Sequence, residues 1–156
     1  MADLVLTGGA ALEKKLEAIA RGLSRAARVK VGFLEGAIYP DGTSVPMVAA
    51  IQEFGAPAAG RKSHPVVIPP RPFFRNMIAA KSKEWPKAMA VIARDHNYNA
   101  DTVLRLMGEA IAGQLRESII NTNDPPNAPS TIAGKGFDSP LIDTSHMLDS
   151  VDFEVE

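Results

Sequence analysis

The residues best suited to chemistry in this chain are its three histidines, His64, His96 and His146. None of them lies at helical spacing from another, so they do not form a paired metal-binding motif. Asp143 and Ser145 precede His146 closely and would be its partners in a hydrolytic triad. Triads are assembled from separated elements, however, because near neighbours in sequence cannot generally reach the relay geometry. A solvated helix face explains His146 better, and we expect neither a catalytic centre nor a metal site.

Other signals for enzymatic chemistry are weak. The chain contains no cysteine, which excludes thiol catalysis, disulfides and cysteine-ligated metals. The paired glycines of LTGGAAL precede a helical pattern, but no convincing strand leads into them and no lysine follows at the spacing of a phosphate-binding loop. We therefore predict a protein that is not an enzyme and that binds no cofactor.

Charge is distributed unevenly along the 156 residues, although the net charge is only −1. Segment 61–94 carries eight basic residues and one acid, a net charge of +7, whereas segment 95–156 carries three basic residues and eleven acids, a net charge of −8. Such a split favours a self-complementary assembly or a nucleic-acid partner for segment 61–94. It is equally explained if the two segments face each other within one subunit or lie on solvated helix faces.

Residues 66–78, with the sequence VVIPPRPFFRNMI, combine three prolines with two arginines and two phenylalanines. Each proline fixes φ and removes an amide donor, so these residues cannot lie in a central strand or a helix interior. The pattern predicts a rigid extended arm that delivers Phe73 and Phe74 to an apolar surface. The alternative is an ordinary loop that enters a helix, with Pro72 in the first turn.

Hydrophobic periodicity predicts the helices. Apolar residues at three- and four-residue intervals indicate an amphipathic helix over 10–27 and a long helix that ends near Ile120. Ser44 and Gly55 are suited to begin and end a short helix between them. Pro86 lies inside a further helical pattern and should kink or restart it.

Alternating apolar residues predict strands in 29–36 and 151–155, and a further short strand is expected at 66–68. Two turn-rich segments, 56–65 and 121–136, show no periodicity. We expect both segments to be mobile in a free subunit and ordered in an assembly, because their proline, glycine and small polar residues bury little apolar surface.

These elements predict an α+β fold with a small, mostly antiparallel sheet packed by the N-terminal helix and the long central helix. The length and the hydrophobic content of 46% fit one domain over 1–156, with an extended arm and assembly loops at 56–72 and 121–140. No apolar run reaches the length of a membrane helix, so no membrane partner is expected.

Three motifs follow one another along the chain: IQEFGAP at 51–57, IPPRPFFRNMI at 68–78 and SPLIDTSHMLDSVDFEV at 139–155. In this order they resemble the neck and tail-completion proteins of long-tailed bacteriophages, the group described as minor tail, tail-component or virion-morphogenesis proteins. The motifs take in 35 residues, and between them only lengths and helical pattern match. The family often has glycine at the position of Ser145.

The resemblance implies a structural virion protein, assembled in the host cytoplasm, that forms a hexameric or dodecameric ring at the head–tail junction or the top of the tail, beside other neck and tail proteins. A stiff arm loses little conformational entropy on docking, which suits such an interface. The candidate interface residues are Arg61, Lys62, Pro70, Arg71, Pro72, Phe73, Phe74, Arg75, Leu141, Asp143 and Met147. The candidate DNA-facing residues are Lys81, Lys83 and Lys87. The alternative function is a DNA-handling factor that uses segment 61–94.

Overall fold

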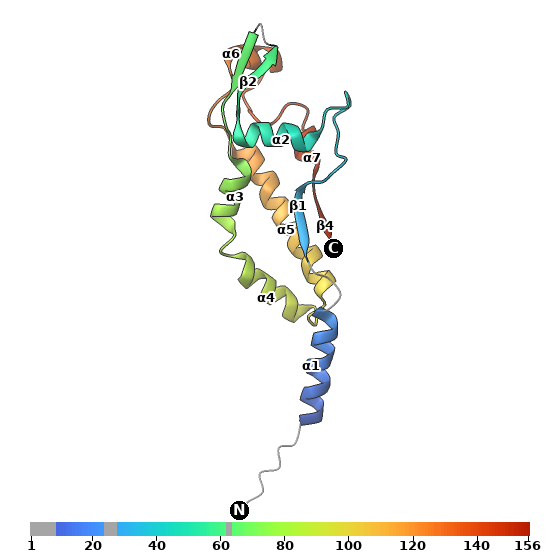
Figure 1. Cartoon of the computed structure of the whole chain (residues 1–156). Coiled ribbons are helices and arrows are strands. Elements are labelled where there is room, and N and C mark those ends of the chain that lie inside the picture. The colour runs from blue at the N-terminus through green and yellow to red at the C-terminus, as the bar shows by residue number, and fades with distance from the viewer. Residues whose placement is uncertain (1–8, 24–27, 62–63) are drawn as a thin grey trace, which may run out of the picture.

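The computed structural model describes residues 9–23, 28–61 and 64–156. Within these ranges the chain forms helices and antiparallel strands, which confirms the predicted α+β class (Figure 1). In chain order the elements are α1 (Gly9–Leu23), β1 (Val29–Phe33), α2 (Val45–Phe54), β2 (Ala56–Arg61), β3 (His64–Ile68), α3 (Phe73–Lys81), α4 (Trp85–Asp95), α5 (Ala100–Asn121), α6 (Pro129–Lys135), α7 (His146–Asp149) and β4 (Val151–Val155).

The predicted helix ends are confirmed at α2 and at the boundary between α3 and α4. The Ser44 hydroxyl accepts a hydrogen bond from the Met47 amide at 3.4 Å and caps α2. Gly55 ends α2 with a φ of 75°, which favours glycine. Pro86 lies in the first turn of α4, where its missing amide is tolerated, so the helix restarts there as expected.

The two strands farthest apart in sequence form one antiparallel pair, in which Val29 of β1 is opposite Val155 of β4. Helix α5 packs across this pair. A Cβ atom at Gly108 would lie 2.5 Å from the Phe153 ring and 2.9 Å from the Val29 side chain, so glycine allows helix and sheet to approach this closely. The predicted role of the long central helix in packing the sheet is therefore confirmed.

The hydrophobic core lies between α2, α3, α5 and the closing segment of the chain. Its buried members are Val45, Ala49, Phe73, Met77, Ala112, Leu115, Ile119, Leu141, Met147 and Val151. None of the helices in the described ranges is long and apolar enough to cross a membrane.

Helix α1 does not pack on the sheet, which corrects one part of the predicted fold. It extends from one end of the subunit (Figure 1), and none of its residues is buried. Its leucines Leu12, Leu16 and Leu23 are 60%, 56% and 53% exposed. Periodicity identified an apolar face correctly, but it does not tell which surface covers that face, and within this subunit α5 covers the sheet instead. The last predicted residues of this helix, 24–27, lie outside the described residues.

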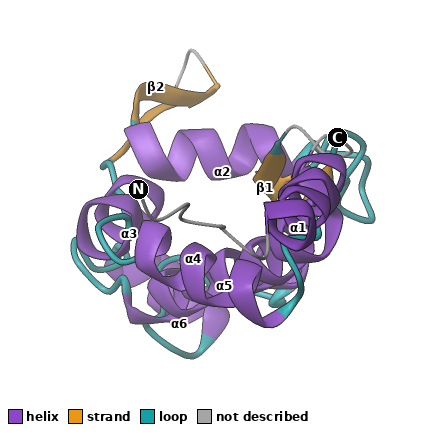
Figure 2. Cartoon of the chain, turned by 90° about the horizontal axis from the view of Figure 1, so that it is seen from below, coloured by secondary structure: helices purple, strands orange, loops and turns teal. Residues whose placement is uncertain are grey.

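Strands β2 and β3 form an antiparallel hairpin, so the prediction of a loop at 56–65 is wrong. The hairpin lies at the end of the subunit opposite α1 (Figure 1), and a view along the long axis shows β2 on the outer side of α2 (Figure 2). Successive residues of both strands, Pro57 and Ala58 in β2 and Val66 and Val67 in β3, are exposed, so burial of one face does not impose an alternating apolar pattern on them. Helix α6 likewise replaces part of the loop expected at 121–136.

Candidate assembly surfaces

The first and second motifs meet where α2 ends and α3 begins, a region called the α2–α3 junction (Gln52, Glu53, Arg71, Phe73 and Arg75). Glu53 is buried at the end of α2. Its carboxylate accepts hydrogen bonds from the Phe74 amide at 2.8 Å and the Arg75 amide at 3.2 Å. These amides belong to the first turn of α3, where the helix itself offers no acceptor. Glu53 therefore caps α3 from a different helix, and its charge also suits the positive end of the α3 dipole.

Arg75 completes the ionic part of the junction. Its Nε donates to the Glu53 carboxylate at 2.7 Å, and its Nη2 donates to the Glu53 backbone carbonyl at 3.0 Å. The guanidinium also lies over the Phe54 ring, 4.9 Å from the centroid. The Arg75 side chain nevertheless remains 57% exposed. It is thus paired within the subunit while one edge still faces outward.

Arg71 is only 5% exposed and joins α2 to the loop that follows α5. Its guanidinium donates to Gln52 Oε1 at 2.9 Å, to the Pro125 carbonyl at 2.9 Å and to the Pro126 carbonyl at 3.2 Å. Burial lowers the pKa of Arg71, and the nearby Asp138 carboxylate acts in the opposite direction. Because arginine stays protonated in proteins, the three acceptors hold a charged group. Arg71 is therefore a buried connector within the subunit.

Gly55 is required at the junction because the end of the hairpin passes directly over it. A Cβ atom there would lie 2.8 Å from the Ile68 carbonyl oxygen and 2.9 Å from the Pro70 nitrogen, both of them backbone atoms. The glycine of the EFG sequence thus allows the prolines of the second motif to lie against the end of α2.

Phe73 lies in the core of its own subunit and is 1% exposed. Its ring meets Phe33 edge to face, with 6.2 Å between the ring centroids, and its carbonyl accepts a hydrogen bond from the Ser118 hydroxyl at 2.7 Å. Pro72 occupies the N-cap position of α3. From Pro72 onward the chain therefore follows the alternative interpretation, in which a loop enters a helix.

This arrangement corrects the predicted set of interface residues. Four of them, Arg71, Phe73, Leu141 and Met147, are buried inside the subunit and offer no contact surface. The sequence pattern misled because a stiff, aromatic segment looks the same whether it fits its own core or a neighbour. Pro70, Arg75 and Asp143 are exposed, and Pro72 and Phe74 are half-buried. Lys62 lies outside the described residues, and of Arg61 only the backbone is described, as the last residue of β2.

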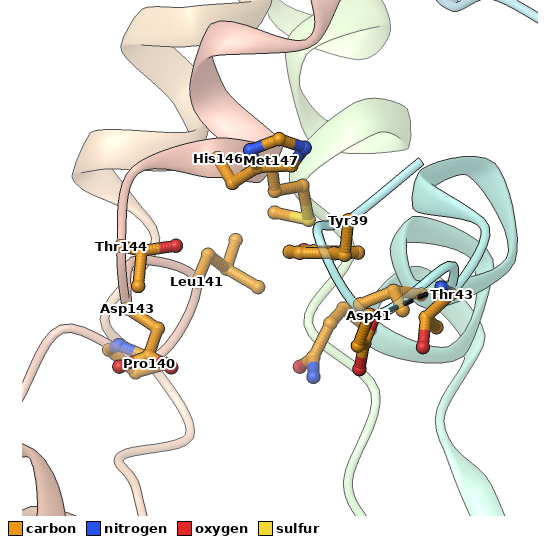
Figure 3. A pocket seen from close by; sticks show the side chains of 11 residues that line it. Tyr39, Asp41, Thr43, Pro140, Leu141, Asp143, Thr144, His146 and Met147 are labelled. Carbon is orange, nitrogen blue, oxygen red and sulfur yellow. Dashed lines mark hydrogen bonds between the residues drawn. The ribbon is translucent and has the colours of Figure 1, made fainter. Parts of the chain in front are cut away.

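The third motif lines a surface cavity of about 290 Å³. Tyr39, Asp41 and Thr43 lie on one side of it, and the segment that carries Asp143 lies on the other (Figure 3). Burial, followed by the charges of Asp143 and Asp41, raises the pKa of Tyr39. Hydrogen bonds from Thr43 lower the pKa of Asp41. The cavity lining contains the carboxylates of Asp41 and Asp143, which suit a cationic group better than an anion.

His146, the histidine singled out in the sequence, lies at this cavity. Its Nε2 is 2.7 Å from the carbonyl oxygen of Ile38, and its ring packs against Tyr39 at a centroid distance of 4.8 Å and an interplanar angle of 34°. The contacts explain the residue as a bridge between the third motif and the loop after β1. Ser145 precedes it with a φ of 60° and makes no side-chain capping bond to α7.

The three candidate DNA-facing lysines lie on the surface around α3 and α4. Lys81 is half-buried at the end of α3, Lys83 is exposed in the turn that follows, and Lys87 is exposed on α4. None of them forms an ion pair with a carboxylate among the described residues. They keep their charge available, in contrast to Arg71 and Arg75.

An apolar groove, which the sequence did not predict, lies beside the junction. Its volume is about 220 Å³, and its floor and rim come from β1, α2 and α3. The lining residues are Phe33, Pro46, Ala49, Ala50, Glu53, Phe54, Phe73, Phe74 and Arg75. Phe54 lines this groove and is 66% exposed, more than any other phenylalanine of the described residues. The only signal in the sequence is that Phe54 follows Gln52 and Glu53 at the last turn of a helix whose other residues are apolar.

No family model, no curated protein and no solved structure matches the chain.

Proposed function

We propose that this protein is a structural component of a bacteriophage virion, which forms a ring at the head–tail junction or at the top of the tail and joins or completes the tail. The observation that carries the proposal has two parts. The second and third motifs share one hydrophobic core, to which Glu53 of the first motif is hydrogen-bonded through α3, and two projections extend from opposite ends of this subunit (Figure 1). The first and second motifs hold the base of the hairpin, where Gly55 lies against Ile68 and Pro70.

Both projections expose apolar residues that a lone subunit leaves in water. Val66 and Val67 of β3 are 55% and 70% exposed, and the leucines of α1 are more than half exposed. A single two-stranded hairpin is at best marginally stable in water, so a neighbouring surface would stabilise it. Different surfaces at the two ends are what a head-to-tail interface requires, and such interfaces close into rings when the rotation between subunits permits.

The test removes the protein from an assembling phage by a nonsense codon in its gene. We expect heads filled with DNA and separate tails, and addition of the purified protein to the lysate should restore joined, infectious particles. Electron microscopy and plaque counts measure both results. Normal infectious particles assembled without the protein would overturn the proposal.

The second candidate, a DNA-handling factor, is favoured by the unpaired cations Lys81, Lys83 and Lys87. It is weakened by Arg71 and Arg75, which the sequence assigned to the same basic segment but which bind within the subunit. If the lysines bind phosphates, affinity for duplex DNA falls steeply with salt, and replacing Lys83 and Lys87 by alanine makes that dependence shallower. Absence of DNA binding at low salt would remove this candidate.

A further inference from the structure

We propose that α1 of one subunit docks its apolar stripe (Leu12, Leu16, Ile19 and Leu23) into the apolar groove of a second copy. This contact specifies how neighbouring subunits of the ring bind each other, and it rests on the proposed function. It would make the N-terminal helix the element that each subunit inserts into the next.

The stripe has the form of a contact surface. Its residues follow one another at intervals of four, three and four, which places them on one side of α1. Helix α1 has 15 residues, so it extends about 22 Å at 1.5 Å per residue. Leu12, Leu16 and Leu23 are each more than half exposed, and Ile19 is half-buried. Polar residues such as Lys14 and Arg21 occupy the other side, so the helix has one face to bury.

The groove matches this stripe in chemistry. Aromatic and small apolar side chains supply nearly all of its lining, and its ionic group is the Glu53–Arg75 pair. Arg75 remains partly exposed at the groove, and Glu13 lies beside the stripe on α1, so the two opposite charges can approach each other. An aliphatic ridge with a carboxylate at its edge therefore meets an aromatic groove with a guanidinium at its rim.

A second copy is the occupant that this geometry favours. Within one subunit α1 points away from the core, and only its last turn approaches the body, where Gly22 meets the Tyr98 carbonyl (Figure 1). Pairing of two α1 helices is disfavoured because the stripe covers less than two heptads, whereas coiled coils sustain about three to four.

The small area of the contact favours a closed ring over an isolated dimer. A helix of this length and a diameter of about 10 Å covers on the order of 200 Å², well below the roughly 800 Å² per partner of a standard interface. One such contact forms only a weak dimer. In a closed ring every subunit supplies one stripe and one groove, so each is held twice and closure stabilises the whole. We therefore expect assembly that passes from monomer to ring without a stable dimer.

Because the chain has no cysteine, disulfide cross-linking tests the contact directly. A mixture of the Leu16→Cys and Ala50→Cys variants should form a covalent dimer on mild oxidation, since these residues belong to the stripe and the groove. A chain that carries both substitutions should form a ladder that ends at the ring. Leu16→Gln, without any cysteine, should raise the concentration needed for assembly by about tenfold or more, as measured by native mass spectrometry.

Ala18 provides the matched control, because it is exposed on the other side of α1. Ala18→Cys should not cross-link to Ala50→Cys, and Ala18→Gln should leave assembly unchanged. The inference is overturned if Leu16→Cys cross-links mainly to itself, or if rings form without a Leu16–Ala50 cross-link above this control. In the second case the proposed function stands, provided that the nonsense phage fails to join heads and tails. Cross-linked rings of a protein that phage assembly does not need would instead preserve the contact and overturn the function.

Discussion

At the α2–α3 junction Phe73 is 1% exposed and Arg71 is 5% exposed, whereas Leu12 on α1 is 60% exposed and Val67 on the hairpin is 70% exposed. The junction supplies every buried charge with partners, three acceptors for Arg71 and three donors for Glu53. On α1 and the hairpin, in contrast, large apolar side chains remain more than half exposed. Residues of the same kinds therefore stabilise the subunit in one region and remain available for association in the other. Substitutions should accordingly affect folding at the junction and assembly at the projections.

The largest effect on stability should come from Phe73→Ala. Removing a fully buried phenylalanine leaves a cavity and costs about 3–5 kcal/mol of the free energy of unfolding. Phe54→Ala removes the same ring from an exposed position and should cost less than about 1 kcal/mol, mostly through the lost contact with Arg75. Urea denaturation measures both variants. Similar losses for the two phenylalanines would show that Phe73 is not the core residue of the pair.

Arg71→Lys should have the next largest effect and lower the free energy of unfolding by about 2–3 kcal/mol. Lysine is a point charge and cannot reach three acceptors in the plane of a guanidinium, so the Pro125 and Pro126 carbonyls lose their donors. Arg75→Lys is the matched control and should cost less than about 1 kcal/mol, because that side chain is half exposed and its ion pair is screened.

Hydrogen exchange sharpens this comparison between the arginines. Amides of the loop at 122–128 should exchange faster in Arg71→Lys and remain unchanged in Arg75→Lys. If the loop keeps its protection without Arg71, its order has another source and the connector role is wrong.

Glu53→Gln should cost about 1–2 kcal/mol. Glutamine keeps the size of the side chain but loses the charge that faces Arg75 and the α3 dipole, and its single carbonyl oxygen replaces two acceptors. Glu84→Gln is a suitable control, since Glu84 stands before α4 without a side-chain capping bond. Thermal unfolding should detect the first substitution and not the second. An equal shift in Tm for both variants would mean that Glu53 contributes only through the net charge of the protein and not through its contacts with α3.

The ends of the helices could be predicted from the sequence, but the contacts of the α2–α3 junction could not. Ser44, Gly55 and Pro86 act locally, and their effects on helix ends depend on backbone geometry that each residue carries with it. Arg71 acts over 54 residues of chain, on carbonyls that any sequence would present. Nothing local distinguishes an arginine that binds its own loop from one that binds a neighbour.

The projections show the same limit from the other side. The sequence pattern identifies the apolar stripe of α1, but it does not identify the surface that the stripe contacts. The hairpin was missed because its strands lack the alternation that burial of one face produces. Both errors fall where the subunit leaves residues uncovered, which is also where we propose that neighbours bind.

The smallest effect should be a gain in stability from Ser145→Gly. Ser145 adopts φ 60° and ψ 0°, a left-handed conformation that costs a non-glycine residue on the order of 1 kcal/mol. Its side chain makes no capping bond that glycine would lose. Glycine removes the steric cost but adds conformational entropy to the unfolded chain, which offsets about 0.4–1 kcal/mol. The net gain in the free energy of unfolding should therefore lie between zero and about 0.6 kcal/mol.

Ser82→Gly tests the sign of this effect. Ser82 ends α3 with φ −59° and ψ −27°, which serine adopts without strain. Glycine at this position relieves no steric strain but still adds conformational entropy to the unfolded chain. Ser82→Gly should therefore lower the free energy of unfolding by about 0.5–1 kcal/mol. Parallel urea denaturation of the two variants would then show opposite signs for one chemical change. A loss at both positions would mean that the packing of the third motif holds Ser145 without measurable strain. The resemblance to a family that often has glycine there would then have no energetic basis in this chain.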